Sequence, residues 1–265
     1  MFQHKIGRNM SLLYDYTFQT DTLLPGLTLG ANGSESLASS SYPYGIEDRL
    51  EPSIAPDGSK ALLSRITGDD AETSGAIRSE LSVDKGPALT GANRERWYVF
   101  DVWIPSTHTP NVRTSFMQIH DDPDAGEGVV KSPNFEFVVF DGIVHVDLPK
   151  DCPTEQAGYR PLPGTRLITD RWVQIVLHVF WEIDSTAFLE VAYDGVILCK
   201  EWNRANHYPD VKQPYIKIGL YDVYHGGIVG DYSAWYRNLR IYGGRHTAQE
   251  VLGSVIKPKP TRIVD

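Results

Sequence analysis

Short runs in which apolar and polar residues alternate, each bounded by turn-forming residues, recur along this chain from Ala61 onward. Alternation of this kind is typical of a strand with one buried face, because successive side chains of a strand point to opposite faces. No long stretch shows the period of 3.6 residues that an amphipathic helix requires. The sequence therefore predicts β-sheets, with one short helix near residues 246–255.

The expected strands lie within residues 61–67, 75–83, 96–105, 112–120, 134–142, 142–149, 172–181, 187–202, 215–223 and 233–243. Tyr-Asp-Gly at 193–195 is a good hairpin turn inside one of these runs. Many short strands without intervening helices indicate an all-β fold. We expect a β-jelly roll, that is, a concanavalin-like sandwich of two antiparallel sheets.

The length of 265 residues suits a single all-β domain with a full core. Residues 1–60 are expected to form an N-terminal arm, with one strand near 11–18, and long Ser-, Gly- and Pro-rich loops that pack on the sandwich. Residues 61–246 are expected to form the jelly roll itself, in one domain with the arm. Residues 247–265 are expected to form a C-terminal tail, extended where prolines break it.

The net charge of −9 at pH 7 disfavours nucleic acid as a partner, because binding phosphates requires a basic surface. An acidic ligand held in a locally basic groove is still compatible with this charge. The longest apolar run, 173–181, is far too short to span a bilayer, so no membrane partner is expected. The N-terminal residues lack an apolar segment of signal-peptide length. The sequence leaves the location and the oligomeric state open.

No cofactor is expected from the sequence. Cys152 and Cys199 fit no spacing of metal-binding or redox cysteines. The acidic segment HDDPDAGEG at 120–128 lacks the regular ligand spacing of an EF-hand. We expect a solvated loop there, with a structural calcium ion as the alternative.

Three of the expected strands pair a clean apolar side with an unusual polar side. The polar sides carry Arg78 and Glu80, then Gln118 and His120, and then Tyr215, Lys217 and Tyr221. Phe116 is expected on the same face as Gln118. Solvated outer faces of sheets usually carry Thr, Ser, Lys and Glu, whereas this set is rich in residue types that bind sugars and transfer protons.

The motifs RSEL (78–81), QIH (118–120) and YIKIGLY (215–221), in this order, resemble the motif set of jelly-roll polysaccharide lyases. These are the alginate lyases, the glucuronan lyases and the heparin-lyase-I-like enzymes, and the similarity covers roughly residues 61–244. Alginate lyases usually continue the first motif with a second arginine, where this chain has Ser82. They also usually have Gln or Asn shortly after the third motif, where this chain reads DVYHGG. These departures favour a heparin-lyase-I-like or glucuronan-type substrate over alginate.

The resemblance implies a polysaccharide lyase whose catalytic domain is residues 61–246. Such an enzyme cleaves an extracellular, acidic, uronic-acid-containing polysaccharide by β-elimination. The C5 proton of a uronate is only weakly acidic while the neighbouring carboxylate is charged, so the site must stabilise that carboxylate. It must also supply a base for the C5 proton and an acid for the departing O4.

The predicted catalytic residues are Arg78, Gln118, His120 and Tyr221. Arg78 and Gln118 are expected to bind the carboxylate, since a guanidinium matches its two oxygens. Tyr221 is expected to give a proton to O4. The base is either His120, whose residue type titrates near neutral pH, or Tyr221 itself if the C5 proton and O4 lie on one side.

The predicted substrate-binding residues are Glu80, Lys217 and Tyr215. Glu80 is expected to orient Arg78 or to bind a hydroxyl group. Lys217 is expected to lower the pKa of Tyr221 or to bind an adjacent uronate.

Two other functions are compatible with parts of the sequence. A non-catalytic glycan-binding or structural jelly-roll protein of a surface or phage assembly would explain the unmatched arm and tail. A glycoside hydrolase is disfavoured, because WEIDSTAFLE at 181–190 has Ala187 where the second carboxylate of a retaining pair would stand. We interpret Asp184 as a turn residue and His178 as structural. Trp202, Tyr208, Tyr224 and Trp235 are candidates for stacking on sugars, although each alone is more typical of packing.

Overall fold

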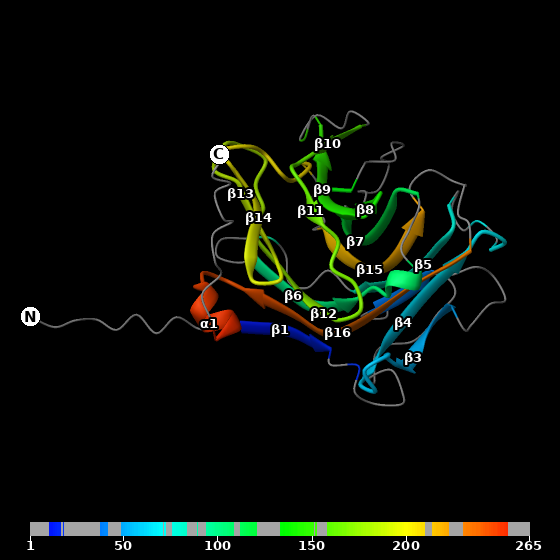
Figure 1. Ribbon diagram of the computed structural model, residues 1–265. Helices are drawn as coiled ribbons and strands as arrows, with labels where there is room; N and C mark the ends of the chain where they lie inside the picture. Colours follow the sequence, from blue (N-terminus) through cyan, green and yellow to red (C-terminus); the bar gives the residue numbers. More distant parts are fainter. Residues whose placement is uncertain are drawn as a thin grey trace, which may run out of the picture.

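The computed structural model of the chain describes residues 11–16, 38–41, 49–70, 76–83, 94–108, 112–120, 133–150, 158–209, 214–222 and 230–253, together with Phe18, Glu72, Leu89 and Cys152. β-strands dominate this part of the chain (Figure 1). A 3₁₀ helix, η3 (Ser106–His108), follows one strand, and helix α1 (Ala248–Leu252) follows the last. No helix in the described residues is long and apolar enough to cross a membrane.

The strands form two antiparallel sheets. Sheet A has the order β14 (Val196–Trp202), β13 (Phe188–Tyr193), β12 (Trp172–Phe180), β6 (Glu95–Trp103), β16 (Asp231–Gly243), β4 (Lys60–Thr67) and β3 (Leu50–Ile54), and β1 (Ser11–Tyr16) also pairs with β16. Sheet B has the order β10 (Tyr159–Pro161), β9 (Ile143–Pro149), β8 (Phe135–Phe140), β7 (Thr114–His120), β15 (Tyr215–Asp222), β5 (Arg78–Val83) and β2 (Ala38–Ser41), and β11 (Thr165–Arg166) pairs with β9. The predicted all-β jelly roll is confirmed.

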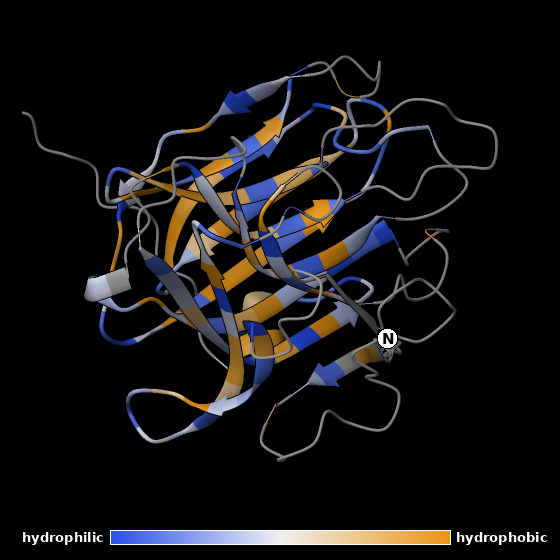
Figure 2. Cartoon of the chain, turned by 90° about the vertical axis from the view of Figure 1, so that its right-hand side faces the viewer, coloured by the Kyte–Doolittle hydropathy of each residue, from blue (hydrophilic) through white to orange (hydrophobic). Residues whose placement is uncertain are grey.

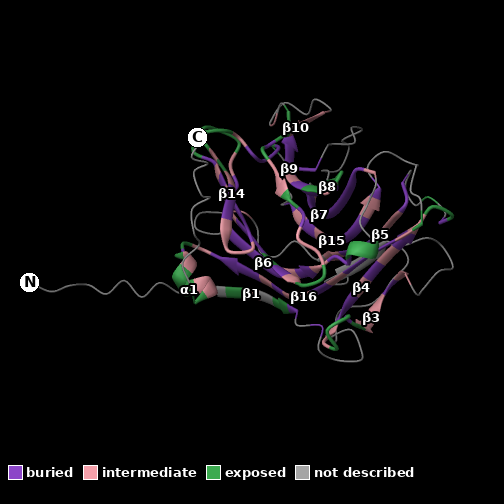
Figure 3. Cartoon of the chain, in the orientation of Figure 1, coloured by how far each residue is buried: buried purple, intermediate pink, exposed green. Residues whose placement is uncertain are grey.

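The main core lies between the two sheets. Alternate residues of each strand point into it, which gives the banded strands of Figure 2 and the largely buried strands of Figure 3. The largest fully buried side chains include Trp181, Phe100, Tyr236 and Phe137. Each such side chain stabilises the fold by roughly 1.5–3 kcal/mol relative to exposure. In Figure 1, strands β7 and β15 curve into a U whose open side faces away from sheet A.

The predicted hairpin turn at residues 193–195 joins β13 to β14. Asp194 and Gly195 both have positive φ, at 54° and 74°. A two-residue turn with positive φ at both positions matches the right-handed twist of the strands it connects. The same Asp-Gly device, at Asp141 and Gly142, joins β8 to β9.

The first 60 residues contribute strands to both sheets. β1 lies close to where the sequence predicted a strand and pairs with β16. β2 pairs with β5, and β3 pairs with β4, so these two segments are strands where loops were expected. Leu50, which begins β3, is fully buried in the core. Segments this short and polar give little periodic signal, because pairing with a neighbouring strand rather than their own pattern makes them strands.

Helix α1 is the short helix that the sequence predicted. Thr247 caps its N-terminus, and the side chain of Glu250 reaches back to the Thr247 backbone, which completes a capping box. The helix ends at Gly253, whose φ of 67° is left-handed. Ala248, Val251 and Leu252 pack on a small apolar cluster on the outer face of sheet A.

Candidate active site

The residues predicted for the site lie on three adjacent strands, β5, β15 and β7 of sheet B. The residues that alternate with them are Leu81, Met117, Ile119, Ile216, Ile218 and Leu220, which lie in the core. The predicted residues therefore occupy the opposite face, which turns away from sheet A. We call it the polar face of sheet B. Its register pairs Tyr221 with Arg78, Lys217 with Gln118, and Tyr215 with His120.

The structure corrects one placement on β7. Phe116 was expected beside Gln118, but it lies in the core, with its ring centroid 5.2 Å from that of Phe137. A β-bulge explains the difference, since the register with β8 shifts between Ser115 and Met117. An extra residue in one strand moves the residues before it to the other face.

Glu80 and Gln118 meet above the intervening strand β15. The amide of Gln118 donates a short hydrogen bond to the carboxylate of Glu80, although the two strands are not neighbours. Gly219 is the residue of β15 paired with Glu80, and a Cβ there would lie 2.1 Å from the Ser79 carbonyl oxygen. The missing side chain lets the Glu80 backbone lie close and leaves room for the contact with Gln118.

Arg78 and Tyr221 form the closest cation–ring pair of the predicted site. The guanidinium carbon lies 4.5 Å from the centroid of the Tyr221 ring, and Arg78 Nη1 lies 3.6 Å from Glu80 Oε2. Burial raises the pKa of Tyr221, and the charge of Arg78 opposes that shift. The Tyr221 hydroxyl therefore keeps its proton at neutral pH. The buried carboxylate of Glu80, only 1% exposed, is positioned to orient both Arg78 and Gln118.

Lys217 is not among the charges that shift the pKa of Tyr221, so binding of an adjacent uronate, the other role expected from the sequence, stays a prediction. The cation that lowers the pKa of Tyr221 is Arg78, its direct partner across the strands, whereas Lys217 lies four residues away along β15. The Lys217 ammonium instead lies 5.5 Å from the centroid of the Tyr215 ring. Burial lowers the pKa of Lys217, and the carboxylate of Glu80 opposes that shift.

His120 lies toward the other end of the polar face. Its ring centroid is 6.0 Å from that of Tyr215, whereas Tyr221 is paired with Ser115, five residues back along β7. At about 3.3 Å per residue, that is roughly 15 Å along a strand. The structure thus groups Arg78 with Tyr221, and His120 with Tyr215, with Gln118 and Lys217 between the two pairs.

Strands β8 and β9 extend the polar face with charged residues that sequence reasoning missed. Glu136 pairs with Gln118 and with Asp147 in register, and its side chain is 0% exposed. Arg113, just before β7, forms a short ion pair with Asp147 and lies 3.6 Å from Glu136. His145 Nε2 lies 3.4 Å from Asp147 Oδ1, and burial lowers the pKa of His145.

Glu136 is the least exposed of these charged groups. Neither of its carboxylate oxygens has a hydrogen-bond partner among the described residues. Burial raises its pKa to about 7, although Arg113 acts in the opposite direction. The signal that could have found it is present in the sequence: a carboxylate alternates with phenylalanines in NFEFVVF, as Gln118 alternates with apolar residues in SFMQIH.

No group of three or more His, Cys, Asp or Glu side chains in the described part of the chain could hold a metal ion. Residues 121–128 of the acidic segment considered for calcium lie outside the described residues. Asp184 is the turn residue that was expected, since its carboxylate accepts hydrogen bonds from the backbone N–H and the hydroxyl of Thr186. Among the residues considered for sugar stacking, Tyr208 is buried, Trp202 is 54% exposed, and Tyr224 lies outside the described residues.

Solved structures with this fold include lyases and a binding domain. An endo-β-1,4-glucuronan lyase from the fungus Trichoderma reesei aligns with a TM-score of 0.63 and 18% identity, over 89% of this chain and 96% of that chain. The PL-14 alginate lyase from Aplysia kurodai aligns with a TM-score of 0.58 and 11% identity, over 87% of this chain and 98% of that chain. The binding domain of botulinum neurotoxin serotype D/C aligns with a TM-score of 0.56 and 8% identity, over 91% of this chain and 50% of that chain. Identities this low show a shared fold, and a fold alone does not define a function.

A comparison of sequences with family models is more specific. A search of curated proteins gave no match. The family model described as polysaccharide lyase matches residues 48–240, which is more than half of the 265 residues. This match begins before Ala61 and includes all three motifs on which the predicted resemblance rested. The chain therefore belongs to the polysaccharide lyase family.

Proposed function

We propose that this protein cleaves a uronic-acid-containing polysaccharide by β-elimination on the polar face of sheet B. The observation that carries the proposal is the placement of Arg78 against Tyr221, with Gln118 and Lys217 on the same face. A carboxylate binder, an amide donor and a protonated phenol are the groups that an elimination beside a uronate requires. They are held on rigid strands rather than on loops, which keeps their geometry fixed.

The first step is binding of the uronate carboxylate. Arg78 presents a planar fork to its two oxygens, and Gln118 has a second amide hydrogen beyond the one it donates to Glu80. Glu80 holds both donors in place from a buried position. Donors arranged in advance stabilise the charge that develops on the carboxylate when C5 loses its proton.

Proton transfer completes the reaction. Burial raises the pKa of Tyr221, so its hydroxyl carries the proton that the departing O4 needs. His120 is the base where the C5 proton and O4 lie on opposite faces of the sugar. Where they share one face, Tyr221 is the base only as its phenolate, and it then returns the proton taken from C5 to the departing O4. The U-shaped curvature of β7 and β15 tilts the two ends of the polar face toward each other, which supports a sugar lying between His120 and Tyr221 (Figure 1).

The substrate that we favour is a glucuronan or a heparin-like polymer rather than alginate. Ser82 stands where alginate lyases usually have a second arginine, so this chain has one carboxylate-binding arginine fewer on β5. The similar structures act, by their names, on both glucuronan and alginate and do not separate these substrates.

The test is to incubate the protein with polyglucuronate, alginate, heparin and pectate and to follow ultraviolet absorbance. Elimination leaves a C4–C5 double bond conjugated to the carboxylate, which absorbs, whereas hydrolysis gives reducing ends without it. We expect absorbance to rise with at least one polymer. New reducing ends without absorbance would indicate a hydrolase, and retention on a polymer without cleavage would indicate a glycan-binding protein.

A further inference from the structure

The outer face of sheet A, on the opposite side of the sandwich from the polar face of sheet B, is rich in aromatic residues. Of the six tryptophans in the chain, Trp181 lies in the core. The others project from the outer face of sheet A: Trp97, Trp103, Trp172, Trp202 and Trp235. An outer face that only meets water does not need this apolar surface, and large exposed aromatic groups often mark binding sites.

Trp202 is the tryptophan of this face that is open to solvent. Its ring stacks on Phe188, with centroids 4.9 Å apart, and Phe188 stacks on Phe180 at 6.0 Å. The three rings stand in register on β14, β13 and β12. Among the described residues β14 is the edge strand of sheet A, so no further strand of this part of the chain covers the other face of the indole, and Trp202 is 54% exposed.

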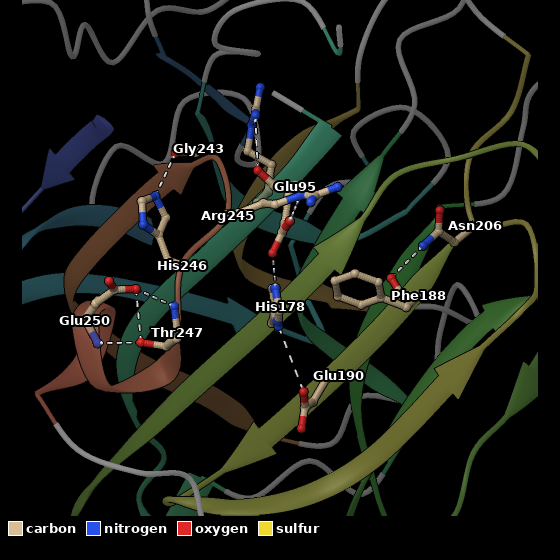
Figure 4. A network of polar contacts seen from close by, with 11 residues as sticks. Glu95, His178, Phe188, Glu190, Asn206, Gly243, Arg245, His246, Thr247 and Glu250 are labelled. Carbon is tan, nitrogen blue, oxygen red and sulfur yellow. Dashed lines mark hydrogen bonds and ion pairs between the residues drawn. The ribbon is translucent and has the colours of Figure 1, made fainter. Parts of the chain in front are cut away.

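Two ion pairs lie beside these rings, and in each the cation is more exposed than the anion. Lys200, two residues before Trp202 on the same face, is 46% exposed, and its partner Glu190 is 18% exposed. Arg245 is 82% exposed, and its partner Glu95 is 10% exposed. Figure 4 shows Glu95, His178 and Glu190 in one line across the sheet, with Arg245 at the Glu95 end. The exposed ends of these two ion pairs are therefore cationic, on a protein whose net charge is −9.

We propose that Trp202 and Lys200 form a non-catalytic anchoring site for an acidic polysaccharide chain. A sugar ring has an apolar C–H face that stacks on an indole, and Trp202 offers one indole face fixed from behind by Phe188. A carboxylate on the same chain meets Lys200. The proposal rests on the proposed function only for the acidic character of the polymer.

Anchoring on sheet A and cleavage on sheet B are compatible in one polymer. The two faces are opposite, so a chain bound at Trp202 cannot occupy the active site with the same sugars. A second binding site raises the effective concentration of the polymer near the first, which strengthens overall retention without a new contact at the active site. The anchor thus matters for long or immobilised polymer.

The experiment measures retention on immobilised polyglucuronate and alginate. All variants carry Arg78→Ala, which weakens binding at the active site. The test variant adds Trp202→Ala. The matched control adds Ile54→Ala, because Ile54 is 57% exposed and lies on β3, the opposite edge strand of the same sheet. Thermal unfolding checks that each variant is folded, and Trp202→Phe provides a second test that keeps an aromatic ring.

We expect Trp202→Ala to weaken retention about tenfold, which corresponds to about 1.4 kcal/mol, and Ile54→Ala to leave it unchanged. Trp202→Phe should fall between the two. Equal retention of the Trp202→Ala and Ile54→Ala variants, or no retention of the parent protein that carries Arg78→Ala alone, overturns the anchor. If either of these results is found while the wild type forms unsaturated product, the anchor is ruled out and the proposed lyase activity stands. If Trp202→Ala weakens retention but the wild type forms no unsaturated product, the anchor stands and the proposed lyase activity is ruled out.

Discussion

The polar face of sheet B and the outer face of sheet A carry similar charged residues. The two faces differ in the hydrogen bonds and ion pairs that these side chains form. On sheet A, His178 Nε2 lies 2.9 Å from Glu95, and its other ring nitrogen faces Glu190 (Figure 4). Glu190 also forms a short ion pair with Lys200. On sheet B, Glu136 is fully buried without a hydrogen bond among the described residues. On sheet A, Glu95, His178 and Glu190 pair across neighbouring strands, and cross-strand pairs of opposite charge stabilise a sheet.

The difference separates a structural network from a candidate functional one. Burying a charged group costs stability even when, as for Glu136 and Arg113, it has an ion-pair partner, so such groups persist where another requirement keeps them. Burial shifts the pKa of Glu136, Lys217 and Tyr221 in the direction that favours each neutral form. The opposite holds for His178: burial lowers its pKa, but Glu190 and Glu95 outweigh burial and raise it. Functional chemistry is therefore expected on sheet B, and the following predictions test that contrast.

Tyr221→Phe should have the largest effect. The substitution removes only the phenolic oxygen, so folding and substrate binding should be nearly unchanged. The rate of unsaturated-product formation should fall by about 100- to 10,000-fold, the range for a general acid or base. A variant that keeps more than about a tenth of the wild-type rate would lie outside this range and rule out Tyr221 as the proton donor.

Arg78→Ala should impair binding as well as turnover. The uronate carboxylate is charged before and during the reaction, so Arg78 interacts with it in both states. Dissociation constants and initial rates on the same polymer separate the two variants. Weakened turnover with unchanged affinity in Arg78→Ala would contradict a role in binding the carboxylate.

Gly219→Ala tests whether the close approach above β15 is required. A Cβ at Gly219 would lie 2.1 Å from the Ser79 carbonyl oxygen, and its φ is +136°. We expect a loss of roughly 2–5 kcal/mol in the free energy of unfolding, measured with urea. The control is Gly58→Ala, since Gly58 has a φ of +85° and open space around it. Equal losses in both variants would show that the positive φ alone matters.

The sequence predicted the strands better than it predicted the site. Alternation located the strands that carry Arg78, Gln118 and Tyr221, because a buried face imposes a strict period of two. It misplaced Phe116, since a bulge breaks that period without a mark in the composition. Which cation meets Tyr221 was not visible either, because it depends on pairing between strands distant in sequence.

Glu136 shows a different limit of the sequence. Its alternation with phenylalanines was visible, yet whether a carboxylate on that face meets solvent or lies under its neighbours depends on the curvature of the sheet. Arg113 precedes β7 and reaches Asp147 on β9, two strands away, which no spacing along the chain reveals. Long-range pairs of this kind become visible only in the assembled sheet.

Glu136→Gln should change how stability depends on pH. The pKa of Glu136 is about 7 in the folded protein, against an ordinary value of 4.5. As pH rises from 4.5 to 7 the unfolded chain ionises at this residue while the folded protein does not, so the wild type loses stability. The loss amounts to at most roughly 3 kcal/mol. Urea unfolding at pH 5 and pH 8 measures the free energy of unfolding of both proteins. Relative to the wild type, the variant should be more stable at pH 8 than at pH 5. A difference that does not vary with pH would mean that Glu136 is ionised throughout.

His178→Gln should have the smallest effect, and it should appear in another pH range. The pKa of His178 is raised above its ordinary value of 6.5. The ion pairs with Glu95 and Glu190 therefore stabilise the wild type fully below about pH 6.5, and this contribution is lost as pH rises through the raised pKa. The contribution should be on the order of 1 kcal/mol, because the side chain is only partly buried. Unfolding of both proteins at pH 6 and pH 9 measures it, and the unsaturated-product rate should stay close to that of the wild type. A variant that folds normally but loses turnover would place chemistry on sheet A and remove the contrast between the two faces.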